Sequence, residues 1–154
     1  MRIDTLYYTD GWNAKVEVLW RCDSPIRPDE DIHGENYSIY IDGTIEARSD
    51  FLYDFASGAV DTDAMKVAAL AHDIPCRAIR QGLLDPSWQP VADRLLQTVY
   101  LRVDVGDLGW FKSSVRKIRA KWVFRAVREY QKRKPRILFE SHPVKRIPAE
   151  KKDK

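Results

Sequence analysis

The sequence predicts a single α+β domain in which an N-terminal antiparallel β-sheet is followed by three helices. Three observations lead to this fold class. The first fifty residues are rich in β-branched and aromatic side chains with partial alternation, a helical period begins after residue 60, and no internal repeat is visible. Strands that come first and helices that come later are typical of α+β proteins. We expect one domain over residues 1–134, with strands in about 1–50, helices in about 61–134 and a basic C-terminal tail over 135–154.

The strand region contains three segments with strand character. The first two are "IDTLYY" and "AKVEVLW", and Asp10-Gly11 can form the turn between them. "SPIRPDEDIHGEN" has the Pro, Asp, Gly and Asn content of a polar loop. "YSIYIDGTIEA" places two alternating segments across Asp42-Gly43, which predicts a two-residue hairpin loop. Together these segments predict an antiparallel sheet of three to five strands.

The first predicted helix follows a group of capping residues and ends near a glycine. Asp61, Thr62 or Asp63 can cap its start, and Gly82 can end it. Its apolar stripe consists of Met65, Ala68, Ala69, His72, Cys76 and Ile79. Pro75 lies in the middle, so we expect the helix to be kinked or divided into two shorter pieces.

Two further helices are predicted before the tail. One begins near Ser87 to Pro90 and runs to about Val103, with the inward positions Val91, Leu95, Leu96 and Val99. The other runs from about Trp110 to Lys132, with one face made of Phe111, Val115, Ile118, Trp122, Ala126 and Tyr130. Pro135 should end it, and the last six residues, "AEKKDK", should fray.

Composition limits the class of protein. The chain has 154 residues, 44% of them hydrophobic, which suits one globular domain with a core of its own. No run of about 18 apolar residues occurs, so we expect no transmembrane segment. The start "MRIDTLYYTD" lacks the pattern of a signal peptide. Cys22 and Cys76 form neither a disulfide framework nor a zinc-binding motif, and buried thiols in a reducing compartment are expected.

Charge is distributed unevenly along the chain. Residues 1–111 carry ten Lys and Arg against nineteen Asp and Glu, whereas residues 112–154 carry sixteen against four. Within residues 112–136 eleven of twenty-five residues are basic, and the polar side of the predicted helix includes Lys112, Arg116, Arg119 and Arg128. This pattern predicts a surface for phosphates of nucleic acid or lipid headgroups, with a solvated face docked on the acidic body as the alternative.

A set of acidic residues around one histidine carries the candidate chemistry. "YDFAS" places Asp54 and Ser57 just after the sheet, His72 and Asp73 lie on the first helix, and Asp93 lies near the start of the second. A carboxylate that orients a histidine allows it to take a proton from water. Asp73 projects about 100° away around the helix, so we expect it to bind a metal ion rather than to orient His72. Asp93 is the expected orienting residue.

Each of these residues also has a structural interpretation. His72 lies on the apolar stripe, where a histidine with satisfied hydrogen bonds is commoner than a catalyst. Asp73 and Arg77 form an ordinary i,i+4 pair, and Asp93 suits the N-terminal end of a helix. The polar residues of "YDFAS" can form a turn by bonding to the local backbone.

The segments "YDFAS", "AALAHD" and "VADRLL" together resemble a phage and prophage family, the domain of unknown function number thirteen fifty-three. Its members show a Thr-Asp-x-Ala-Ser turn, a helix with His-Asp and an Ala-Asp pair on the next helix. The matching residues are Asp54, Ala56, Ser57, His72, Asp73 and Asp93, and the resemblance covers about residues 35–130. Two departures occur: "GAVDTDAM" replaces a Pro-rich segment, and Cys76 stands where a Tyr is frequent.

The His-Asp helix is also similar to that of the phospholipase A-two superfamily. That similarity implies His72 as the base, Asp73 as a calcium ligand and Asp93 as the orienting residue. The disulfides and the Gly-rich calcium loop of those enzymes are missing from this sequence. A weaker similarity to His…His-Asp…Asp phosphohydrolases would use His33, His72, Asp73 and Asp104, but those proteins are all-helical. Such analogies between folds are associational.

Two functional hypotheses follow. The first is a phage or prophage-encoded metal-assisted hydrolase with catalytic His72 and Asp93, metal ligands Asp73 and Asp54, Ser57 in support and a divalent cation, calcium favoured. The second is a non-enzymatic virion or accessory protein in which the same residues form a buried polar network. Either protein would act in the virion or the bacterial host cytoplasm, with a viral protein or an anionic surface as partner. An open or a sealed His72–Asp93 pair distinguishes the two hypotheses.

Overall fold

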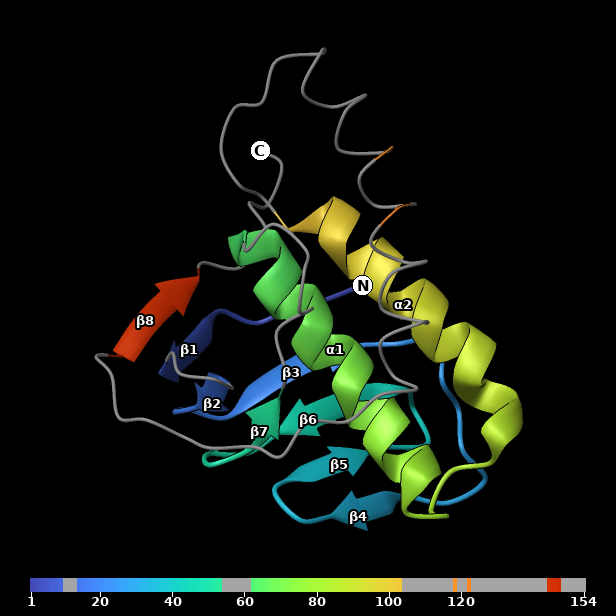
Figure 1. Cartoon of the computed structure of the whole chain (residues 1–154). Coiled ribbons are helices and arrows are strands. Elements are labelled where there is room, and N and C mark those ends of the chain that lie inside the picture. Colours follow the sequence, from blue (N-terminus) through green and yellow to red (C-terminus); the bar gives the residue numbers. More distant parts are fainter. Residues whose placement is uncertain (10–13, 54–61, 104–117, 119–121, 123–143, 148–154) are drawn as a thin grey trace.

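The computed structural model in Figure 1 describes residues 1–9, 14–53, 62–103, 118, 122 and 144–147. In this part of the chain the fold is α+β, as predicted, with two antiparallel sheets and two α-helices. The elements are β1 (Leu6–Thr9), β2 (Ala14–Val16), β3 (Trp20–Asp23), β4 (Ile32–Gly34), β5 (Tyr37–Ile39), β6 (Thr44–Ala47), β7 (Leu52–Tyr53), α1 (Asp63–Arg80), the 3₁₀ turn η1 (Pro86–Trp88), α2 (Gln89–Arg102) and β8 (Val144–Ile147).

The strands form two sheets rather than the one sheet that the sequence predicts. Over the described residues the strand orders are β7-β2-β1-β8 and β3-β6-β5-β4, with all neighbours antiparallel. The segment "AKVEVLW" divides between them, because β2 ends at Val16 and β3 begins at Trp20. Val18 and Leu19 lie between these strands and are exposed, so this apolar run is not one continuous buried strand.

The β5–β6 hairpin occurs where it was predicted, but its loop has three residues instead of two. Ile39 pairs with Ile45, and the Tyr40 N–H donates to the Thr44 carbonyl at 2.8 Å. The Gly43 N–H donates to the Tyr40 carbonyl at 2.8 Å, and Gly43 has a φ of 83°. This combination is a turn followed by a left-handed glycine, the usual three-residue hairpin loop. Asp-Gly therefore located the turn correctly and gave its length incorrectly.

Besides β7, which follows shortly after the last predicted strand segment, two strands lie where the sequence predicts no strand. β4 lies within the expected polar loop and pairs with β5, with Ile32 opposite Ile39. β8 lies within the expected C-terminal tail and pairs with β1, with Leu6 opposite Ile147. Each strand is short and rich in polar residues, so the neighbouring strand determines its conformation more than its own sequence does.

Helix α1 begins and ends where the sequence predicts, but it is not divided at Pro75. The Thr62 hydroxyl accepts from the Met65 N–H at 3.3 Å at the N-terminus, and Gly82, with a φ of 71°, follows the C-cap Gln81. The eighteen-residue helix continues through Pro75. An internal proline removes one backbone hydrogen bond, and the burial of most of α1 offsets that loss.

Helix α2 follows the predicted second helix closely, and the preceding turn η1 is capped by Asp85, whose Oδ1 accepts from the Ser87 N–H at 2.7 Å. Its inward residues Leu95, Leu96 and Val99 are buried, and Val91 is partly buried. Figure 1 shows α1 and α2 side by side, and α1 also contacts β5, β6 and β7. Helix α1 thus contacts both α2 and three of the strands. No helix in the described ranges is long and apolar enough to cross a membrane.

Candidate functional site

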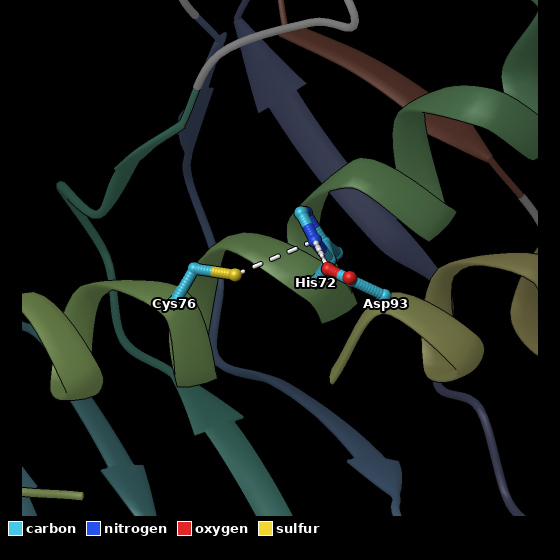
Figure 2. A group of neighbouring side chains, drawn as sticks. All are labelled: His72, Cys76 and Asp93. Atoms are coloured by element: carbon cyan, nitrogen blue, oxygen red, sulfur yellow. Dashed lines mark hydrogen bonds and ion pairs between the residues drawn. The ribbon is translucent and has the colours of Figure 1, made fainter. Parts of the chain in front are cut away.

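A cluster of polar side chains lies between the two helices. His72 and Cys76 are four residues apart on α1, so they project from the same side of the helix, and Asp93 faces them from α2 (Figure 2). Their exposed fractions are 1%, 1% and 5%, respectively. The cluster is therefore sealed between the helices, and its polar atoms must find their partners within the protein.

The imidazole Nε2 of His72 is the centre of this cluster. It lies 3.2 Å from Asp93 Oδ1 and 3.4 Å from Cys76 Sγ. The nitrogen, the sulfur and a carboxylate oxygen of Asp93 all lie within 4.8 Å of one another. The predicted pairing of His72 with Asp93 is therefore present, and Cys76 joins it as a third member that was not predicted.

Gln89 closes the cluster on the α2 side. Its Nε2 donates to Asp93 Oδ1 at 2.8 Å and also contacts Cys76 Sγ at 3.3 Å. Gln89 is partly exposed, unlike the three residues that it contacts. Gln89 therefore lies at an edge of the cluster that reaches solvent.

Asp73 occupies the other side of the imidazole. Its Oδ1 lies 3.5 Å from Nδ1 of His72, and its side chain is 18% exposed. Asp73, which the sequence predicts as a metal ligand and not as the orienting partner, therefore lies beside His72. The helical step of 100° separates the Cβ directions of adjacent residues, but the Nδ1 atom lies close to its own backbone, within reach of a short neighbouring carboxylate. Both ring nitrogens of His72 therefore face carboxylates.

The surroundings of His72 change its proton affinity in two directions. Burial disfavours the charged imidazolium and lowers the pKa. Electrostatic attraction to Cys76 and hydrogen bonds with Asp73, Asp93 and Cys76 favour the imidazolium and raise it. The net result is a pKa of His72 well above its usual value of 6.5. The neighbouring carboxylates and thiol together outweigh the effect of burial on the pKa of His72.

The arrangement of His72, Cys76 and Asp93 suits metal binding better than general-base catalysis. His72, Cys76 and Asp93 together could hold a metal ion. A general base, in contrast, must come within hydrogen-bond distance of the proton that it removes. The two nitrogens of His72 contact protein atoms and the side chain is sealed, so neither nitrogen is presented to a substrate.

Several predicted site residues lie outside the described part of the chain. These are Asp54 and Ser57, the basic residues Lys112, Arg116, Arg119 and Arg128, and Asp104. Ile118 and Trp122 are described, are helical and are 70% and 64% exposed, so these two residues of the predicted apolar face do not lie in the core. His33 lies on β4, where its Nδ1 is 3.1 Å from Ser38 Oγ.

Sequence reasoning missed two members of the cluster. Cys76 had a usable signal, since it stands four residues after His72 on the same predicted stripe. Gln89 had none, because its role depends on how α2 packs against α1. No protein-family model, curated protein or solved structure matches the chain.

Proposed function

We propose that this chain is a non-enzymatic phage virion or accessory protein in which the buried cluster of His72, Cys76 and Asp93 joins α1 to α2. The observation that carries the proposal is the sealed contact between His72 Nε2 and Asp93 Oδ1. A buried histidine with a carboxylate on each nitrogen has its hydrogen bonds satisfied without a substrate. The cluster then contributes to the packing of two helices.

The phage context is supported by the resemblance of "YDFAS", "AALAHD" and "VADRLL" to the phage and prophage family. A protein of this kind would act in the virion or in the host cytoplasm. The basic segment 112–136 supports a partner with negative charge, either a viral protein or a surface of nucleic acid or lipid headgroups. The charge alone does not distinguish these partners.

The metal-assisted hydrolase remains the second candidate, because one observation favours it. The order of His72 and Asp93 along the sequence predicted their contact, and a carboxylate that orients an imidazole is a feature of catalytic histidines. In a hydrolase, the cluster would have to open to admit a substrate.

Replacement of the histidine separates these candidates. His72→Gln should lower the free energy of unfolding by about 1–3 kcal/mol, because Asp93 and Asp73 lose a buried partner. Chemical denaturation in a chelator measures the change without any metal contribution. His33→Gln is the matched control, and this exposed site should change stability by less than about 0.5 kcal/mol.

A screen of the parent protein for esterase, phosphodiesterase and phospholipase activity, with divalent ions present, completes the test. We expect no turnover above the blank. The structural role would be overturned if the parent had a hydrolase activity and His72→Gln lost that activity while remaining as stable as the parent.

A further inference from the structure

We infer that His72 Nε2, Cys76 Sγ and Asp93 Oδ1 form a binding site for a borderline-soft divalent metal ion of the zinc type. The bound ion would join α1 to α2 through three side chains. This inference deepens the proposed structural role and rests on it in one respect, namely that the cluster is closed to substrates.

Two separations that involve His72 Nε2 are close to those of tetrahedral coordination, and all three ligand atoms lie within 4.8 Å of one another. Bond lengths of zinc to nitrogen, oxygen and sulfur place neighbouring ligand atoms about 3.4 to 3.6 Å apart. The Nε2–Oδ1 distance is 3.2 Å and the Nε2–Sγ distance is 3.4 Å. Around His72 Nε2 an ion therefore requires only a small adjustment of side chains that already face one another. The i,i+4 spacing on α1 fixes two of the three ligands on one rigid element.

The types of ligand decide which ion fits. Thiolate and imidazole are ligands that zinc prefers, whereas calcium takes six to eight oxygen atoms and magnesium prefers an octahedron of them. The cluster offers one carboxylate, one imidazole and one thiol. This donor set supports a zinc-type ion in place of the calcium expected from the sequence.

Asp73 supplies an independent feature of histidine-ligated metal sites. A histidine that binds a metal through one nitrogen usually donates its other N–H to a carboxylate or a carbonyl, which fixes the orientation of the ring. Nε2 of His72 faces the cluster, and Nδ1 lies 3.5 Å from Asp73 Oδ1. In this site Asp73 is thus a positioning residue, whereas the sequence predicts it as a ligand.

Gln89 provides both access and a fourth ligand position. Its amide contacts Asp93 Oδ1 and Cys76 Sγ, and the residue is partly exposed. A rotation of the Gln89 side-chain amide by about half a turn would point its oxygen toward the ion, where its own nitrogen now lies. Movement of the same side chain would open a route from solvent.

Metal titration of the full chain tests the inference. The protein is purified in chelator, exchanged into buffer and titrated separately with Zn²⁺, Ca²⁺ and Co²⁺. We expect one Zn²⁺ per chain and a higher melting temperature, since the ion binds only the folded cluster. Co²⁺ should give the near-ultraviolet charge-transfer absorption of a thiolate ligand. An equal amount of Ca²⁺ should leave the melting temperature unchanged.

Two serine variants locate the site. Cys76→Ser should abolish the charge-transfer absorption and the Zn²⁺-dependent rise in melting temperature. Cys22→Ser replaces the other buried thiol and should retain both. If Cys76→Ser does not fold, Asp73→Asn replaces it, and this variant should weaken Zn²⁺ binding by about 10- to 100-fold.

The results for the metal and for the structural role are separable. Failure of the parent to bind Zn²⁺, or retention of the charge-transfer absorption in folded Cys76→Ser, would overturn the metal site. In that case a destabilised His72→Gln in chelator would still support the structural cluster. Hydrolase activity of the Zn²⁺-loaded parent that His72→Gln abolishes would instead contradict the structural role and leave the metal site in place.

Discussion

Cys22 and Cys76 are both free thiols and both are buried, yet they lie in different chemical surroundings. Cys22 is on β3, opposite Ile45 of β6, and its Sγ donates to the Asp23 carbonyl at 3.2 Å. Burial, followed by the charge of nearby Asp23, raises the pKa of Cys22 to about 12, so this thiol stays protonated. Cys76 instead contacts the imidazole of His72 and the amide of Gln89.

The difference shows that burial alone does not decide what a cysteine does. Cys22 is a small apolar side chain in a sheet whose stability comes from packing. Cys76 is one of several polar groups between α1 and α2 whose hydrogen bonds must be satisfied by one another. The stability of the sheet around Cys22 should therefore depend mainly on the volume of its buried side chains. The stability of the α1–α2 interface around Cys76 should depend on pH, charge and metal ions.

The largest effect should come from the sheet. Trp20 is fully buried on β3, and its Nε1 donates to the Asp4 carbonyl at 3.1 Å. Trp20→Ala should lower the free energy of unfolding by about 3–5 kcal/mol, because it leaves a large cavity. Denaturation with urea measures this loss, which should be the same in Zn²⁺ and in chelator. If Zn²⁺ largely restored the stability of Trp20→Ala, the sheet and the α1–α2 interface would not differ in the expected way.

A smaller effect should appear as a pH dependence of the α1–α2 interface. Because the folded-state pKa of His72 is raised, its contribution to stability is complete below the unfolded value near 6.5. That contribution is lost as the pH rises through the folded-state pKa, by about 1.4 kcal/mol for each unit of the difference. The facing groups are Asp73, Asp93, Cys76 and Gln89.

Unfolding in chelator, measured at a series of pH values from about 6 upward, follows this loss of stability. The parent should lose stability with rising pH more steeply than His72→Gln, which lacks the titrating group. Equal slopes for the two proteins would mean that His72 has no special role in the pH dependence.

The parts of the fold that local sequence determines were predictable. The cap at Thr62, the end of α1 near Gly82 and the inward residues of α2 follow from short-range hydrogen bonding and helical periodicity. The division into two sheets was not predictable, because it depends on which strands pair. β8 is the clearest case, since its partner β1 lies at the other end of the chain.

The candidate site was also predictable only where it depends on the local sequence. The contact of His72 with Asp93 followed from the order of the motifs, and Cys76 could have been added from its spacing. The seal around the cluster could not be predicted, because it depends on the close packing of α1 against α2. The bend of Asp73 back toward Nδ1 is a matter of side-chain conformation, which the helical step does not determine.

The most direct measurement is a double-mutant cycle between His72 and Asp93. The free energies of unfolding of the parent, His72→Gln, Asp93→Asn and the double variant are measured in chelator. If the sealed contact at 3.2 Å joins the helices, the two changes should be coupled by about 0.5–3 kcal/mol. Losses that add to within about 0.3–0.5 kcal/mol would contradict the account, because independent residues behave in that way.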